Sequence, residues 1–193
     1  MNETNPIERF KDSLARAEAA GITLPNAMSL ATANNDGKPS VRMMLLKGVD
    51  ERGFIFYTNV ESRKGRELLA RSDAALCFWW PSLEEQVRVE GRIKDVSHSE
   101  AEAYFATRPR GSQLGAWSSL QSELLTSREE LLAAVEKIRK RFEGREVSCP
   151  PFWSGFILVP DRLEFWFGRP DRLHERILYT RRDKSWTRSL LYP

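Results

Sequence analysis

The stretch MSLATANNDGKPSVRMMLLKGVDERGFIFYT, residues 28–58, decides the fold class of this chain. It holds three short runs of β-forming residues, at 28–33, 41–46 and 54–58. Two clusters typical of tight turns, NNDG at 34–37 and DERG at 50–53, separate these runs. Short turns join antiparallel neighbours, because parallel strands need a long crossover connection. The stretch therefore predicts an antiparallel meander of three strands.

The same β texture continues toward the C-terminus, interrupted by a few helices. Further strands are expected at residues 74–80, 86–96, 155–159, 163–167, 177–180 and 186–191. Helices are expected at 6–20, at 101–107 and 131–142 after capping boxes, and from near Glu61 or Ser62. The helix at 101–107 must stop at Pro109, which leaves residues 110–117 in a loop. About nine strands with peripheral helices predict a single α+β domain, mainly antiparallel and barrel-like, with residues 1–21 as an N-terminal helix.

Composition excludes several classes of protein. Of the 193 residues 41% are hydrophobic, enough for a sizeable core, which excludes wholesale disorder. The longest apolar run, residues 74–80, is far shorter than the roughly 20 residues that span a bilayer. The N-terminus lacks the order of a secretion signal, so we expect a cytoplasmic protein with no membrane partner. The chain has only two cysteines and two histidines, which argues against a metal centre.

The net positive charge is small, but basic residues cluster at particular places in the sequence. Lys and Arg number 30 against 27 Asp and Glu, an excess too small and dispersed for a nucleic-acid partner. Arg63 and Lys64 would lie in the first turn of a helix, where the helix dipole disfavours cations. A bound phosphate would offset that cost, although a solvated turn is the simpler explanation of this stretch alone. Residues 108–117, RPRGSQLGAW, also supply hydrogen-bond donors without a carboxylate.

Seven segments occur in the order and spacing of one known family. They are residues 42–47, 56–59, 61–67, 86–92, 104–105, 108–117 and 163–176. In this combination the chain resembles the pyridoxamine 5′-phosphate oxidases, from about residue 26 to its last residue. The resemblance implies an FMN-binding split β-barrel that works as a homodimer, with FMN at the subunit interface and a C-terminal dimerisation segment.

The resemblance also implies the residues of the site. Those matching FMN contacts are Arg42, Met43, Met44, Leu45, Leu46, Lys47, Tyr57, Thr58, Arg63, Lys64, Gln86, Gln121, Ser122, Trp166 and Arg176. Those matching substrate contacts are Lys47, Tyr104, Arg108, Ser112, Arg172, Leu173 and His174. Arg63 and Lys64 would hold the FMN phosphate, and the first four substrate contacts would cradle the substrate's phosphate. Arg172 and His174 would position the reactive carbon, and they are the expected catalytic residues.

The implied reaction oxidises pyridoxamine 5′-phosphate or pyridoxine 5′-phosphate to pyridoxal 5′-phosphate, as in vitamin B6 salvage. The substrate C4′ carbon gives a hydride to FMN, and O₂ takes the electrons and becomes hydrogen peroxide. Two alternatives remain: a split-barrel flavin oxidase for another metabolite, such as the phenazine-pathway relatives, or a non-enzymatic flavin-binding or nucleic-acid-binding module. Longer family members carry an N-terminal arm that helps to cover the substrate, and we expect the residues of that arm to be missing here. Leu24 stands where relatives often have an acid.

Overall fold

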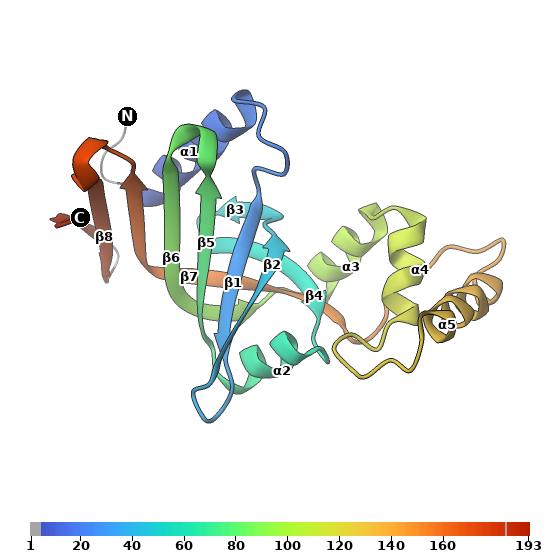
Figure 1. The fold of residues 1–193 in the computed structure, drawn as a ribbon. Helices are drawn as coiled ribbons and strands as arrows, with labels where there is room; N and C mark the ends of the chain where they lie inside the picture. The colour runs from blue at the N-terminus through green and yellow to red at the C-terminus, as the bar shows by residue number, and fades with distance from the viewer. Residues whose placement is uncertain (1–4, 184) are drawn as a thin grey trace.

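A computed structural model describes residues 5–183 and 185–193, which form a nine-stranded antiparallel sheet with helices at its margins (Figure 1). The strand order is β2-β1-β5-β6-β7-β4-β3, and β8 and β9 continue from β7. The strands are β1 (Ala27–Ala33), β2 (Pro39–Leu45), β3 (Gly48–Asp50), β4 (Gly53–Asn59), β5 (Asp73–Trp80), β6 (Glu85–Asp95), β7 (Trp153–Phe167), β8 (Glu175–Arg182) and β9 (Ser185–Leu191). The helices are α1 (Pro6–Ala19), α2 (Arg63–Ala70), α3 (His98–Thr107), α4 (Arg110–Ser118) and α5 (Arg128–Arg141), with short 3-10 turns η1 (Pro81–Leu83) and η2 (Pro170–Arg172). The expected α+β class, mainly antiparallel, is confirmed.

The β1–β2 hairpin forms as the sequence predicts, but the three-stranded meander does not. Ala27 pairs with Leu45 across the hairpin, and Gly37 takes a φ of 79° in its turn. β4 pairs with β3 on one side and with β7 on the other, so the DERG turn joins β4 to a short strand that sequence reasoning missed. The reason is burial. β4 is buried on both faces, and such a strand lies inside a sheet that is covered on both sides.

The chain closes the sheet into a half-barrel at Leu46 and Lys47. The backbone N–H of Leu46 donates to Asn26 O, next to β1, at 2.9 Å. The N–H of Lys47 donates to Ile55 O, on β4, at 2.8 Å. β1 and β4 lie near opposite ends of the strand order. Leu46 and Lys47, which are consecutive in the chain, therefore connect the two margins of the sheet. Lys47 therefore lies at the seam of the half-barrel.

Aromatic side chains fill the interior, and α1 packs against them. The ring of Phe10 lies 4.8 Å from those of Phe54 and Phe78, and all three side chains are fully buried. Asn5 caps α1, since its Oδ1 accepts a hydrogen bond from Ile7 N at 3.0 Å. The expected N-terminal helix is confirmed from Pro6 to Ala19, where it covers part of the core, and residues 1–4 of that expectation lie outside the described residues.

The two strands expected at 155–159 and 163–167 are one continuous strand, β7. Glu90 of β6 pairs with Arg162, whereas the next residue, Gly91, pairs with Pro160, so Asp161 forms a bulge. A bulge tolerates a proline within a strand, because the ladder hydrogen bonds are already interrupted there. Sequence reasoning treated the Pro160–Asp161 pair as a break between strands, which was wrong.

Helices α3, α4 and α5 form a helical lobe on one side of the sheet, opposite the side where β8 lies (Figure 1). The lobe has a core of its own, made by Phe105, Leu114, Phe142 and Val147. The expectation of a loop at 110–117 was wrong, because these residues form α4. Pro109 ends α3 and precedes the first turn of α4, where its missing N–H costs nothing.

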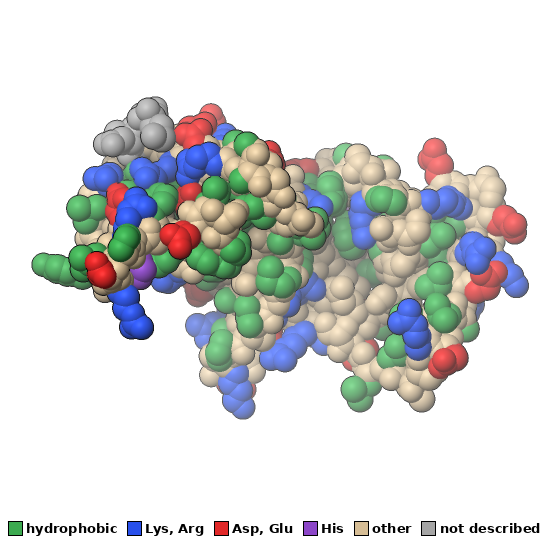
Figure 2. All heavy atoms as spheres, turned by 45° about the horizontal axis from the view of Figure 1, so that its top comes forward, with side chains coloured by type: hydrophobic (Ala, Val, Ile, Leu, Met, Phe, Trp, Pro, Cys, Tyr) green, Lys and Arg blue, Asp and Glu red, His purple; other side chains and the backbone are tan. Residues whose placement is uncertain are grey.

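The surface carries charges of both signs. On the face shown in Figure 2, basic and acidic side chains are interspersed over both the sheet and the helical lobe. No helix within residues 5–183 and 185–193 is long and apolar enough to cross a membrane. In the same residues, no group of three or more His, Cys, Asp or Glu is placed to hold a metal ion.

Candidate functional site

The start of α2 gathers cations at the end of β4. Ser62 caps the helix by accepting a hydrogen bond from Gly65 N at 3.3 Å, and Arg63 and Lys64 follow in the first turn. Position 65 requires glycine, because a Cβ there would lie 2.2 Å from Val60 O. The helix therefore packs directly on the preceding chain. Its first turn, with unpaired N–H groups and two cations, has the composition of a phosphate site.

Lys64 is the buried member of this group, with 8% of its surface exposed. Its Nζ donates to Gln121 Oε1 at 2.8 Å and to Ser62 Oγ at 3.2 Å. Burial, helped by the positive charge of Arg42, lowers the pKa of Lys64 to about 8. Two expected FMN contacts, Lys64 and Gln121, are thus brought together from distant positions. Ser122, the next expected contact, is exposed and has a φ of 78°.

Glu67 lies one turn beyond Arg63 and binds both neighbouring arginines. Its Oε1 accepts a hydrogen bond from Arg63 Nε at 2.9 Å, and its Oε2 lies 3.3 Å from Arg42 Nη2. Thr32 and Ser40 donate to the same Oε2 at 2.5 and 2.6 Å. Burial by itself raises the pKa of Glu67, but the hydrogen bonds from Ser40, Thr32 and Arg63 outweigh it and bring the pKa to about 2. Sequence reasoning missed Glu67, although its i+4 spacing from Arg63 was a usable signal.

A cavity of about 470 Å³ lies between the β2–β4 region and the helical lobe. The four residues expected to hold a substrate phosphate all line it: Lys47, Tyr104, Arg108 and Ser112. Each comes from a different part of the chain, namely the seam, α3, the α3–α4 link and α4. The expected FMN contacts Met43, Met44, Leu45 and Tyr57 line the same cavity, and so do Thr107, Pro109 and Trp153, which sequence reasoning missed.

Stacked aromatic rings form one wall of this cavity. The rings of Tyr57, on β4, and Tyr104, on α3, are 3.9 Å apart and nearly parallel, with 9° between their planes. Lys47 Nζ lies 6.0 Å from the centre of the Tyr104 ring, within the range of a cation–π contact. A flat apolar wall beside basic side chains suits a planar ring that carries an anionic group.

Arg108 lines this cavity and has one unsatisfied donor. Its Cζ lies 4.0 Å from the ring centre of Trp153 and 5.5 Å from that of Phe105. Within the described residues its Nη1 is buried without a hydrogen-bond partner. Burial lowers the pKa of Arg108, but a guanidinium stays charged in proteins. A buried donor without a partner is costly, and an anionic ligand oxygen would satisfy it.

The other expected residues lie at the far end of β7. Gln86, Trp166 and Arg176 pair in one row across β6, β7 and β8. The ring of His174 lies 4.5 Å from that of Trp166. Arg176 Nε donates to Glu164 Oε1 at 2.8 Å, a carboxylate that sequence reasoning did not connect with the site.

The expected catalytic residues lie in and just after η2. Asp171 and Arg172 both have left-handed backbones, with φ of 56° and 61°, which non-glycine residues seldom adopt. His174 Nδ1 accepts a hydrogen bond from Arg169 N at 3.2 Å. Arg172 and Leu173 are exposed. Strained backbone beside exposed side chains is common where a segment meets a ligand.

The two groups of expected residues do not meet within one chain. Tyr57, at the cavity, pairs with Gly155 near the start of β7, whereas Gln86 pairs with Trp166 near its end. At about 3.3 Å per residue, the stretch of β7 between them is about 36 Å long when extended. None of residues 164–176 lines the 470 Å³ cavity, so within one chain these two parts of the expected site lie apart.

Besides Lys64, two expected FMN contacts have buried side chains. Leu46 belongs to the main core and is 3% exposed, and Thr58 is also 3% exposed. Their side chains are therefore occupied by the protein, and contact with a ligand would fall to their backbone.

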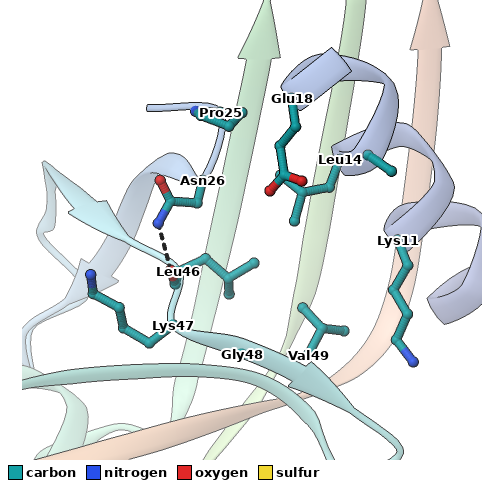
Figure 3. A pocket seen from close by; sticks show the side chains of 10 residues that line it. Lys11, Leu14, Glu18, Pro25, Asn26, Leu46, Lys47, Gly48 and Val49 are labelled. Carbon is teal, nitrogen blue, oxygen red and sulfur yellow. Dashed lines mark hydrogen bonds between the residues drawn. The ribbon is translucent and has the colours of Figure 1, made fainter. Parts of the chain in front are cut away.

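A second cavity, of about 520 Å³, lies between α1 and the seam (Figure 3). Lys11 and Glu18 line it from α1, and Asn26 faces them, donating to Leu46 O at 2.9 Å. Lys47 also borders it, but its side chain points away from Lys11 and Glu18 (Figure 3). Of the residues expected in the site, only Leu46 and Lys47 adjoin this cavity, so the 470 Å³ cavity is the better candidate.

Comparison with protein families covers most of the chain. Residues 14–142 match the model described as pyridoxamine 5′-phosphate oxidase. Residues 153–193 match the model described as pyridoxine 5′-phosphate oxidase C-terminal dimerisation region, which supports a homodimer. The names support an oxidoreductase.

Individual relatives agree with these matches. A pyridoxine/pyridoxamine 5′-phosphate oxidase of Myxococcus xanthus is 54% identical over 100% of this chain and 94% of its own length. One of Burkholderia lata is 51% identical over 98% of this chain and 89% of its own length.

Two solved structures share the fold. PhzG from Burkholderia lata, in complex with tetrahydrophenazine-1-carboxylic acid, has a TM-score of 0.94 at 33% identity, covering 100% of this chain and 94% of that one. A pyridoxamine 5′-phosphate oxidase-related, FMN binding protein of Nostoc punctiforme has a TM-score of 0.77 at 19% identity, covering 95% and 97%, and supports the fold alone. The split β-barrel expected from the sequence is confirmed. With two family models spanning nearly the whole chain and relatives more than half identical to it, this protein belongs to the pyridoxamine 5′-phosphate oxidase family.

Proposed function

We propose that this chain is an FMN-dependent oxidase that converts pyridoxamine 5′-phosphate and pyridoxine 5′-phosphate to pyridoxal 5′-phosphate. Membership of the family supports FMN as its cofactor. The observation that carries the proposal is the cavity where Lys47, Tyr104, Arg108 and Ser112 meet. Besides these four donors its lining holds the hydroxyls of Tyr57 and Thr107 and the indole N–H of Trp153, and it contains no carboxylate, a donor set that favours a phosphate monoester.

The residues at the start of α2 fit the phosphate of FMN. Arg63 has both Nη groups available beyond its Nε bond to Glu67, and Lys64 is a buried cation held by Gln121. A phosphate there would offset the unfavourable placement of two cations at a helix N-terminus. Two phosphates, one of the cofactor and one of the substrate, therefore have two separate basic clusters.

We propose that a second copy of the chain completes each site. The dimerisation match spans residues 153–193, which include Trp166, Arg172, His174 and Arg176. These residues lie far along β7 from the cavity of their own chain. In a dimer of two-fold symmetry, the far end of one chain would meet the cavity of the other, giving two equivalent sites.

Bound FMN would supply a hydride acceptor that O₂ can reoxidise. The chain's own residues would bind and orient the substrate. Lys47 and Arg108 would hold its phosphate, so that the ring lies beside the wall formed by Tyr57 and Tyr104. His174 accepts from Arg169 through Nδ1, which leaves Nε2 to donate a hydrogen bond to the substrate. Arg172, exposed beside it, would close over the ring, and such orientation of C4′ supplies much of the rate.

A second candidate function is the oxidation of a reduced phenazine. The structure of PhzG, with its phenazine-type carboxylic acid, has the same fold at 33% identity. In the same organism, however, a relative named pyridoxine/pyridoxamine 5′-phosphate oxidase is 51% identical to this chain. The cavity is lined by donors and no carboxylate, and Arg108 Nη1 has no hydrogen-bond partner among the described residues, which also favours a phosphate.

Turnover after loading with FMN tests the proposal. We expect pyridoxamine 5′-phosphate and pyridoxine 5′-phosphate to bleach the flavin absorption without O₂ and to yield hydrogen peroxide with it. A reduced phenazine carboxylic acid serves as the competing substrate, and unphosphorylated pyridoxamine as the control for the phosphate. A flavin that stays oxidised with both vitamers, or that is bleached faster by the phenazine, would refute the proposal.

A further inference from the structure

Glu67 differs from the cations around α2 because it is acidic and buried and because two arginines contact its carboxylate. It is 6% exposed, and its carboxylate contacts Arg63 through one oxygen and Arg42 through the other. Among the described residues, no other carboxylate forms an ion pair with either arginine. The proposed function gives Glu67 no role, and yet its two partners are both expected FMN contacts.

The bond to Glu67 determines which edge of Arg63 is free. Arg63 is 60% exposed, so little packing restrains its side chain. Glu67 takes the Nε of Arg63 and leaves both Nη groups unengaged by the carboxylate. A guanidinium binds a phosphate best through two parallel N–H bonds from one edge. Held in this way, Arg63 keeps its two Nη groups as a pair of donors that the carboxylate does not use.

Arg42 is held differently, by bonds that use most of its donors. Its Nη1 donates to Thr32 Oγ1 at 2.7 Å and to Leu30 O at 3.1 Å. Its Nη2 donates to Ser40 Oγ at 2.6 Å and lies near Glu67. Arg42 therefore acts on a ligand mainly through its charge.

The three cations also repel one another in the absence of a ligand. The charge of Arg42 lowers the pKa of Lys64, as burial does, and the charge of Arg63 contributes to lowering that of Arg42. A buried carboxylate between the arginines offsets this repulsion. Without it, the exposed Arg63 would swing toward solvent, because its rotamer freedom is large and its tie is lost.

We propose that Glu67 is the positioning residue of the cofactor's phosphate site. It holds Arg63 and Arg42 so that the free edge of Arg63 and the ammonium of Lys64 converge on one phosphate monoester. The proposal rests on the proposed placement of the FMN phosphate at α2. Glu67 itself does not touch the ligand.

The test compares FMN with riboflavin, which has the same ring but no phosphate. FMN is released from the holoenzyme by dilution and followed by its fluorescence, and riboflavin is measured by its displacement of FMN. We expect Glu67→Gln to raise the Kd of FMN about tenfold, the effect of weakening a charge-assisted hydrogen bond, and to leave that of riboflavin unchanged. Glu61→Gln is the matched control, since it removes the same charge from an exposed position just before the same helix, and it should change neither Kd.

Each outcome has a distinct meaning. If Glu67→Gln prefers FMN over riboflavin as strongly as the unsubstituted protein does, the carboxylate does not position the phosphate site and the proposal is overturned. If the variant binds FMN more tightly, the carboxylate only repels the phosphate, which also overturns the proposal. If the unsubstituted protein binds riboflavin as tightly as FMN, the phosphate site of the proposed function fails instead. Should Glu67→Gln not fold, Ser40→Ala provides a milder change. It removes one bond to Glu67 and one to Arg42, and should lower the preference about threefold; no change would again overturn the proposal.

Discussion

Lys64 is expected to make the affinity for FMN depend on pH. Its pKa of about 8 arises from burial and from the charge of Arg42, against about 10.4 for an ordinary lysine. In the free protein, the charged fraction of Lys64 is then about nine tenths at pH 7 and about one tenth at pH 9. A phosphate ester keeps its second negative charge above about pH 6, so the ligand changes little over this range. Binding requires the ammonium, and the Kd of FMN should rise about tenfold from pH 7 to pH 9.

The sign follows from the coupling of proton and ligand. Bound phosphate raises the pKa of Lys64, so binding takes up a proton above about pH 8 and the affinity falls as the pH rises. Fluorescence titration of FMN at several pH values measures this directly. Lys64→Arg is the control, because a guanidinium stays charged throughout and should give a nearly flat profile. A flat profile in the unsubstituted protein, or an equal slope in Lys64→Arg, would refute the reasoning.

Three further predictions address the 470 Å³ cavity, the segment that contains Arg172 and His174, and the core. Arg108→Met should raise the KM for phosphorylated substrates about 10- to 100-fold with little change in the midpoint of urea unfolding, because Met can still pack against Trp153 and the buried Nη1 has no hydrogen bond to lose; steady-state kinetics with an unchanged KM would contradict this. Arg172→Leu combined with His174→Ala should retain FMN while turnover falls at least about 10²-fold, and undiminished turnover would remove both residues from the site. Phe10→Ala, which removes a fully buried ring, should lower the free energy of urea unfolding by about 3–5 kcal/mol, and a loss below about 1 kcal/mol would show that the core does not depend on it.

Local signals predicted most of the secondary structure. The capping serines, Ser62, Ser97 and Ser127, each accept a hydrogen bond from the backbone N–H three residues further along the chain. Where prediction failed, a local signal had two structural meanings. Pro109 ends one helix and begins another, and Pro160 lies at a bulge within one strand instead of between two. A residue type indicates an interrupted hydrogen-bond pattern, but it does not indicate which element comes after the interruption.

The strand order could not be read from turns. The DERG turn did predict a hairpin, but its partner was the short strand after Lys47 and not the longer strand before it. That choice depends on burial of β4 between β3 and β7, and β7 begins about 100 residues later in the sequence. A pairing of this kind is decided by the whole core, so no local pattern reveals it.

By itself, the sequence determined most of the segments that form helices and strands, though not β3, α4 or the continuity of β7, and through its motifs the family and the residues to examine. The tertiary structure decided which of those residues act together. It placed Lys47, Tyr104, Arg108 and Ser112 around one cavity and left the segment with Arg172 and His174 far along β7. It also showed Glu67 between two arginines, a role that depends on the approach of β2 to α2. The physical reason is that local structure follows from neighbouring residues, whereas charge pairing, burial and cavities arise only where distant segments pack together.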